Sequence, residues 1–255
     1  MFRIITIFLL IILQTFATKV DAIEEVACVT VPKSGTHLMQ KLLWLLGSST
    51  PLYHPQDFYS EKINKEKFKK CILLIRDPRD TCISWVNFVD KKLLGKMGKR
   101  AQSIDKLPEK KMKWKLLCFE DKLTYVIMGN CQETLNKINP AFNTLPLASY
   151  EMMVDLSRKP NTIICKFENL VGPQGGGSRE AQEKEILKIA QFIDLEISYE
   201  KLNQVADSLF GDTYSFQKGQ IGEWKTLFTE EHVNLFKSKR NHLLTHFNYE
   251  KDCDW

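Results

Sequence analysis

The stretch VACVTVPKSGTHLMQKLLWLL, residues 26–46, decides the fold. It opens with an apolar run typical of a buried strand, and residues 35–46 have the apolar spacing of a helix. Between the two, Pro32 ends the strand and a tight turn follows, in which Gly35 lets the backbone approach a ligand closely. The first N–H groups of a helix, together with its dipole, favour an anion. The sequence therefore predicts a strand, an anion-binding turn and a helix in succession.

The lysine of this turn stands in an unusual place for a phosphate loop. Lys33 comes before Gly35, whereas the ATP-binding pattern G-x-x-x-x-G-K-[ST] has its lysine directly after a glycine. That pattern is absent from the chain, so a kinase or an ATPase is not favoured. Taken alone, a Ser-Gly turn before a helix is more often only a turn. Lys33 would add a positive charge at the edge of an anion site.

Two more apolar runs, residues 71–75 and 162–167, resemble buried parallel strands. Each leads towards a charged or glycine-rich turn and then a helical segment. We expect helices at residues 35–46, 78–93, 111–137, 179–193, 198–209 and 229–239. Strands that alternate with helices predict an α/β fold, here a P-loop-like one with three α/β/α layers and a central, mainly parallel sheet. Ligands of such sheets bind at the carboxyl ends of the strands.

The composition suits one compact domain. The chain has 255 residues, of which 44% are hydrophobic and 26% are charged. Its formal net charge of +5 fits an anionic ligand but is too small, by itself, to indicate a nucleic-acid-binding protein. We therefore expect no nucleic-acid partner, and the sequence does not indicate an oligomeric state.

The N-terminal segment differs from the rest of the chain. Arg3 precedes an apolar run from Ile4 to Leu13, and ATKVDA then offers the small residues of a cleavage site. The run is short for a membrane span. We expect residues 1–22 to be a signal peptide or a short membrane anchor, followed by a single domain at residues 23–255; an incorrect start site is the third alternative. A signal peptide or an anchor predicts an exported or lumenal protein. If the segment stays uncleaved, it would also attach the protein to a membrane.

Seven cysteines are scattered along the chain, without the spacing of a disulfide framework or a metal site. Cys28, Cys71 and Cys165 lie in apolar runs, and we expect them to be buried free thiols. One disulfide among the others stays open. Free thiols fit poorly with export. No cluster of His, Cys and carboxylate residues indicates a metal, and we expect none.

The second informative stretch is CILLIRDPRDTCISWVNF, residues 71–88. Asp77 followed by Pro78 is typical of an N-cap and the first helical residue. Arg76 ends the strand, where its guanidinium can reach the cleft, and Ser84 lies about two turns into the helix. Arginine suits phosphate recognition, but a salt bridge to a nearby carboxylate such as Asp77 or Asp80 explains Arg76 equally well.

Taken together, these stretches resemble the sulfotransferase family, whose members use 3′-phosphoadenosine 5′-phosphosulfate (PAPS) as donor. The chain is similar to a bacterial-type member through four motifs in the family's order. These are TVPKSGTHL (30–38), RDPRDTCISWVNF (76–88), CKFENLVGPQGGGSRE (165–180) and FQKGQIGEWKTLFTEE (216–231). The order of the four matches is more specific than any one of them.

The resemblance implies two groups of donor-binding residues. The group for the 5′-phosphosulfate comprises Lys33, Ser34, Gly35, Thr36 and the backbone N–H of His37, which replaces a second threonine. The group for the 3′-phosphate comprises Arg76, Ser84, Lys218 and Gly219. Trp224 would pack in the segment that closes over the donor.

The resemblance also implies a catalytic histidine between the first two motifs. His54, in LYHPQDF, stands 22 positions before Arg76, about the interval that the family shows. The ordinary pKa of histidine, about 6.5, lets it accept a proton near neutral pH. Without the motifs, a surface histidine in a proline-flanked loop would be the better interpretation.

Three positions depart from the family's pattern: Leu52 and Gln217 replace basic residues, and Phe167 replaces a tyrosine. The resemblance implies sulfuryl transfer from PAPS to a hydroxyl or amine of a small-molecule or glycan acceptor, with Lys33 and His54 as the catalytic residues. A protein that binds PAPS or another bisphosphate without catalysis stays open, as does, more weakly, a P-loop phosphotransferase. PAPS is made in the cytosol, which does not fit export unless the donor is delivered to the lumen.

Overall fold

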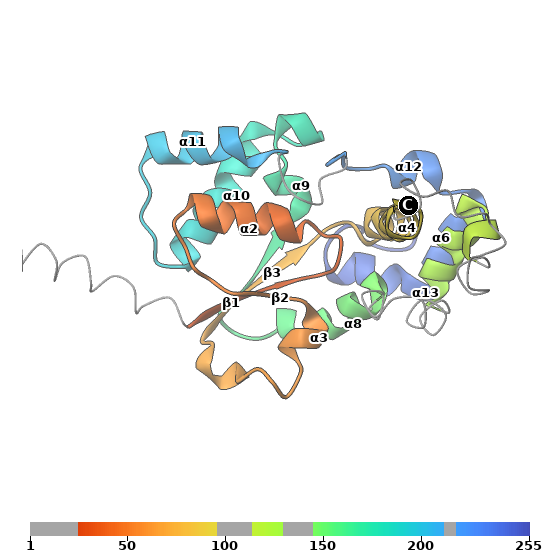
Figure 1. Ribbon diagram of the computed structural model, residues 1–255, viewed down its shortest axis with the longest axis horizontal. Helices are drawn as coiled ribbons and strands as arrows, with labels where there is room; N and C mark the ends of the chain where they lie inside the picture. The colour runs from red at the N-terminus through yellow and green to blue at the C-terminus, as the bar shows by residue number, and fades with distance from the viewer. Residues whose placement is uncertain (1–24, 96–113, 130–144, 212–217) are drawn as a thin grey trace, which may run out of the picture.

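The computed structural model describes residues 25–95, 114–129, 145–211 and 218–255 (Figure 1). The expected signal peptide or anchor at residues 1–22 lies outside these ranges, as do Gln217 and Cys131. None of the helices in the described ranges has the length and apolarity needed to cross a membrane.

The centre of the molecule is a parallel sheet. Its strands are β1 (Val26–Thr30), β2 (Leu52–Tyr53), β3 (Lys70–Ile75) and β4 (Thr162–Lys166), in the order β2-β1-β3-β4. All three pairings are parallel, with Cys28 opposite Ile72 and Leu73 opposite Ile164. The predicted α/β fold with a mainly parallel sheet is confirmed. Strand β2 was not predicted because it has only two residues.

Helices cover both faces of the sheet, as predicted. One face carries α2 (Thr36–Leu45), α10 (Arg179–Phe192) and α11 (Tyr199–Leu209); the other carries α4 (Pro78–Gly95), α6 (Phe119–Met128), α8 (Pro146–Ser157) and α13 (Glu230–His246). Figure 1 shows α2 and α8 on opposite sides of the strands. Alternate residues of β3 supply the two cores: Ile72 and Leu74 face α2, whereas Leu73 and Ile75 face α4. The short helices are α3 (Pro55–Phe58), η1 (Lys65–Lys67), α9 (Phe167–Leu170), η4 (Pro173–Gly175) and α12 (Trp224–Leu227).

Two helix predictions need correction. The predicted continuous helix at 111–137 is wrong, because α6 begins at Phe119 after a Cys118 cap and ends at Met128, before Gly129 in the left-handed conformation. Helix α8 was missed altogether. It begins at Pro146 and buries Tyr150 and other residues, so it is defined by packing more than by a periodic apolar pattern.

The expected buried thiols are confirmed. Cys28, Cys71 and Cys165 are buried and unpaired, and burial raises the pKa of each. Among the other described cysteines, Cys82 is buried and free, while Cys118 and Cys253 are exposed and free.

The order in which strands are added to the sheet changes side at β1. From β1 it runs outward to β2 and then returns to β3 on the other side of β1. The carboxyl ends of these two adjacent strands thus form the switch point, where ligands of such sheets bind. The two turns singled out from the sequence, at residues 31–36 and 76–78, lie side by side there.

Candidate active site

The turn after β1 is fastened to the sheet by Ser34. Its N–H donates to the Val31 carbonyl at 3.0 Å, and its hydroxyl lies 2.7 Å from that oxygen and 3.1 Å from the Leu74 oxygen. Ser34 is fully buried, so its polar groups serve the turn itself. At Gly35, φ is 106°, and a Cβ would lie 2.7 Å from the Phe167 ring. Glycine is therefore required here by both the backbone conformation and the space.

Lys33 places a positive charge in this turn. Its Nζ lies 4.4 Å from the centre of the Phe88 ring, and no carboxylate of the described ranges is within ion-pair distance. Burial, followed by the positive charges of Arg76, Lys91 and Lys92, lowers the pKa of Lys33 to about 8. A cation that burial and like charges disfavour gains most from an anionic ligand.

Arg76 is the second cation, at the end of β3. Its side chain is 7% exposed, its Nη2 donates to the Gln220 carbonyl at 2.7 Å, and its guanidinium stacks 4.6 Å from the Phe167 ring. The salt bridge to a nearby carboxylate, the alternative role for Arg76, is present, because Asp80 Oδ2 lies 3.7 Å from Arg76 Nη2. The Nε atom is buried and has no hydrogen-bond partner in the described ranges. A buried donor without a partner is costly, so this atom is suited to a bound ligand.

Tyr150, on the unpredicted helix α8, holds the backbone of Arg76 in place. Its hydroxyl accepts the Arg76 N–H at 3.1 Å, donates to the Arg76 carbonyl, and lies 3.1 Å from the Thr81 hydroxyl. Tyr150 is fully buried. It is thus a residue of the site that no sequence signal indicated, since its partner is 74 positions away.

We expect Tyr150→Phe to lower the free energy of unfolding by about 1–3 kcal/mol, because the Arg76 backbone loses its partner in a dry environment. Urea denaturation measures this loss. Tyr125→Phe is the matched control, since Tyr125 is 43% exposed, and its unfolding should be unchanged. Equal midpoints for Tyr150→Phe and the wild type would contradict the role assigned to this hydroxyl.

His54 is held in one tautomer by the strand beside it. It precedes α3, and its Nδ1 lies 2.9 Å from the Thr30 carbonyl oxygen. Because a carbonyl only accepts, Nδ1 carries the proton and Nε2 keeps its lone pair. The Thr30 hydroxyl lies 2.8 Å from the Thr36 hydroxyl. Thr30 therefore contacts both His54 and the turn at residues 31–36.

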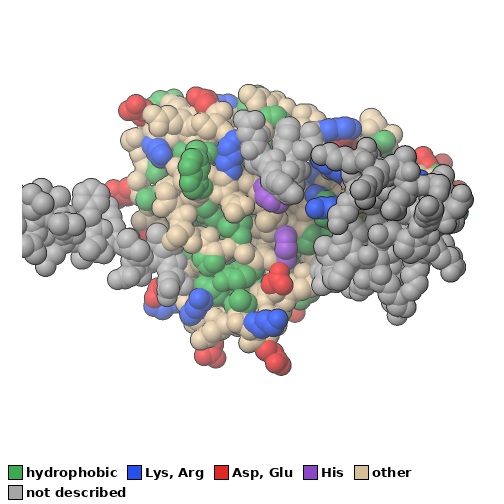
Figure 2. Space-filling model, in the orientation of Figure 1, with side chains coloured by type: hydrophobic (Ala, Val, Ile, Leu, Met, Phe, Trp, Pro, Cys, Tyr) green, Lys and Arg blue, Asp and Glu red, His purple; other side chains and the backbone are tan. Residues whose placement is uncertain are grey.

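His37, the second residue of α2, lies near the same groups. Its pKa is lowered by burial first, and then by the nearby Lys33 and His54. Figure 2 shows exposed histidine side chains near the middle of the molecule, with lysine or arginine side chains to one side and an acidic side chain below them. Lys33, His37 and His54 therefore lie together at the carboxyl end of β1, where Lys33 supplies the positive charge and favours a neutral His37.

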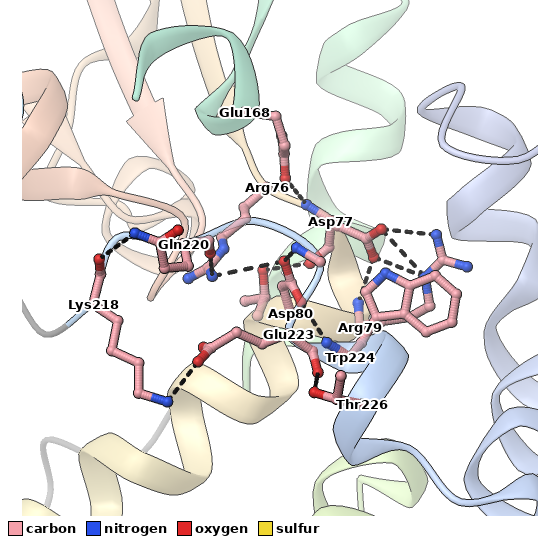
Figure 3. Close-up of polar contacts among 12 residues, drawn as sticks. Arg76, Asp77, Arg79, Asp80, Glu168, Lys218, Gln220, Glu223, Trp224 and Thr226 are labelled. Atoms are coloured by element: carbon pink, nitrogen blue, oxygen red, sulfur yellow. Dashed lines mark hydrogen bonds and ion pairs between the residues drawn. The ribbon is translucent and has the colours of Figure 1, made fainter. Parts of the chain in front are cut away.

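The segment at residues 218–229, here called the closing segment, covers Arg76 (Figure 3). The Asp80 carboxylate accepts the Gly222 N–H at 2.7 Å and the Trp224 N–H at 2.9 Å, and burial raises its pKa. Lys218 is exposed and pairs with Glu223 at 2.8 Å. Gly219 has a φ of 64°. The sequence placed Asp80 in the first turn of α4 but gave no sign that it anchors a segment more than 140 positions away.

The structure thus brings most of the predicted site residues to one edge of the sheet. Lys33 and Arg76 are close enough for the charge of one to lower the pKa of the other. Ser84 lies half-buried on α4, and within the described ranges no side-chain hydrogen bond joins it to the other predicted site residues. Asp77 caps α4 as predicted, through the Arg79 N–H at 2.9 Å. Nowhere in the described ranges do three His, Cys, Asp or Glu side chains gather as metal ligands would.

The chain belongs to the sulfotransferase domain family, which matches residues 55–246. The family recognised from the four motifs is therefore confirmed, and with it the prediction of a sulfotransferase. The matched range begins directly after His54, so the roles predicted for the first turn and for His54 stay predictions.

A solved structure has the same fold. The crystal structure of mouse sulfotransferase SULT7A1 complexed with PAP is similar, with a TM-score of 0.61 and 14% sequence identity, over 88% of this chain and 88% of that chain. The curated protein sequences contain no significant match to the chain.

Proposed function

We propose that the protein transfers the sulfuryl group of PAPS to a hydroxyl or amine acceptor. The observation that carries this proposal is the pair of cations at the ends of β1 and β3. Among the described residues, Lys33 has no carboxylate partner, and the buried Nε of Arg76 has no hydrogen-bond partner. Two anionic groups on one ligand would satisfy both. PAPS, with a 5′-phosphosulfate and a 3′-phosphate, is such a ligand, and the PAP bound in the mouse relative has the same two phosphate positions.

The donor would lie across the switch point. Lys33 and the N–H groups at the start of α2, from Gly35 to His37, would hold the 5′-phosphosulfate. The 3′-phosphate would meet Arg76, Ser84 and the segment at Lys218 and Gly219. Lys218 would then exchange Glu223 for the phosphate. The polar groups of Ser34 are already hydrogen-bonded within the turn, so Ser34 would hold the turn in shape rather than contact the donor.

In the proposed reaction, His54 Nε2 takes the proton of the acceptor hydroxyl or amine as its oxygen or nitrogen attacks sulfur. The bond from sulfur to the bridging oxygen breaks, and that oxygen leaves as part of the 5′-phosphate of adenosine 3′,5′-bisphosphate (PAP). Lys33 and the helix N–H groups stabilise the negative charge that grows on the leaving phosphate. The Thr30 carbonyl stabilises the imidazolium through Nδ1.

Labelled sulfate transfer tests the proposal. Purified protein is incubated with PAPS labelled in its sulfate and a panel of phenols, amines, sugars and glycans, with EDTA present. We expect a labelled product with at least one acceptor class, and PAP released in equal amount. PAP binding with no product across the panel would instead favour a binding protein without catalysis. Magnesium-dependent transfer from ATP would favour a phosphotransferase.

A further inference from the structure

Three side chains behind the donor site pack into one unit, here called the tryptophan–arginine stack. The guanidinium of Arg79 lies 3.7 Å from the ring centre of Trp224 and 4.4 Å from that of Trp255. The two indole rings meet edge to face, with centres 5.4 Å apart and planes at 89°. Arg79 thus fills the corner between two perpendicular rings, an arrangement in which cation–π attraction is strengthened by the exclusion of water.

Arg79 is also fixed by carboxylates. Its Nη2 is 2.7 Å from Asp77 and 2.7 Å from Glu250, and its side chain is 2% exposed. Burial opposes its charge, but the hydrogen bonds and charges of Asp77 and Glu250 raise the pKa of Arg79. The stack therefore stays charged and joins the start of α4 to the segment after α13.

Trp224 connects the stack to the proposed donor site. The backbone N–H groups of Trp224 and Gly222 both donate to the Asp80 carboxylate (Figure 3). In the same segment, the carbonyl of Gln220 accepts a hydrogen bond from Arg76. The indole ring of Trp224 and the backbone that covers Arg76 are therefore parts of one short segment.

Trp255 is held from the other side. Its Nε1 donates to Asn241 Oδ1 at 2.7 Å, and its ring packs edge to face on Phe236 of α13 at 6.3 Å. Asn241 Nδ2 in turn donates to the Asp252 carbonyl at 3.2 Å. Trp255 thus links Trp224 to α13.

From these contacts we propose that Trp255 and Arg79 are positioning residues for the donor. They hold the closing segment down through Trp224, so that Lys218 and Gly219 stay at the 3′-phosphate. This inference rests on the proposed function. Neither residue would touch the donor, and their effect would be on donor affinity rather than on the chemical step.

The test compares Trp255→Ala with the wild type by two measurements. The first is amide hydrogen exchange at Gly222 and Trp224 in the ligand-free protein, which needs no donor. We expect it to become about tenfold faster, while exchange at Val29 and Leu73 in the sheet is unchanged. The second is calorimetric titration with PAP, whose Kd should rise about five- to tenfold. The KM for PAPS should rise similarly, with kcat nearly unchanged.

Three further variants separate a local effect from a general one. Trp255→Phe keeps an aromatic ring on Arg79 and should recover most of the PAP affinity. Trp44→Ala removes a tryptophan that is 75% exposed on α2 and should change neither measurement. Trp255→Leu keeps apolar volume without an aromatic face. If Trp255→Ala does not fold, we expect Trp255→Leu to show the same faster exchange and the same weaker PAP binding.

The outcomes distinguish this inference from the proposed function. Unchanged exchange at Gly222 and Trp224 in Trp255→Ala or Trp255→Leu would overturn the inference, as would faster exchange without any loss of PAP affinity. If the wild type itself does not bind PAP, the proposed function is wrong. The positioning role is then wrong too, even if faster amide exchange in Trp255→Ala shows that Trp255 holds the closing segment in place.

Discussion

His54→Ala is expected to lower kcat for sulfate transfer by about 10²- to 10⁴-fold, the usual contribution of a general base. The KM for PAPS and the affinity for PAP should change little, because the described contact of the His54 side chain is with the Thr30 carbonyl. Single-turnover transfer of labelled sulfate to the best acceptor of the panel measures the chemical step.

Two controls separate proton transfer from local structure. The amide of His54→Asn can still donate to the Thr30 carbonyl but cannot accept a proton, so this variant should be as inactive as His54→Ala. His242→Ala removes an exposed histidine that pairs with Glu151 and should keep full activity. Activity above half of the wild-type rate in His54→Ala would remove His54 from the mechanism.

Lys33→Ala should lower kcat by about 10²- to 10³-fold, the typical cost of removing one group that stabilises charge in the transition state. Unlike His54→Ala, it should also weaken PAP binding, since Lys33 would contact the leaving phosphate. The loss should not come from unfolding. The pKa of Lys33 is lowered to about 8, below that of an unfolded lysine, so its charge opposes folding at neutral pH. Thermal unfolding should therefore show Lys33→Met to be at least as stable as the wild type.

Lys33 also predicts a pH dependence. In the free enzyme its charge is lost as the pH rises through about 8. Because kcat/KM for PAPS reports on the free enzyme, it should fall above that pH. Lys33→Arg stays charged throughout this range, so its profile should lack that fall, although its rate is lower. A wild-type profile that stays flat to pH 9.5 would contradict the assignment.

The sequence was informative where local chemistry determines structure. The apolar run before Pro32, the tight glycine turn and the Asp77-Pro78 cap are local signals, and each predicted the element found. The two cations of the site follow from the same reasoning, because parallel strands that pair side by side end at one edge.

What the sequence did not indicate depends on contacts between distant residues. Asp80 anchors the closing segment 142 positions away, and Tyr150 holds Arg76 from 74 positions away. Neither interaction has a period or a local pattern. Trp255 likewise gains its role only when the chain brings it to Trp224. The family motifs predict Lys218 and Gly219 as site residues, but they do not indicate that the buried carboxylate of Asp80 holds the same segment.

Calorimetric titration with PAP, and separately with ATP and magnesium, tests the central claim most directly. If Lys33 and Arg76 bind the two phosphates of one ligand, as proposed, the wild type should bind PAP at least about tenfold more tightly than ATP. Arg76→Ala should then lose most of this preference. Equal or tighter binding of ATP with magnesium, or a preference for PAP that Arg76→Ala leaves unchanged, would contradict the account.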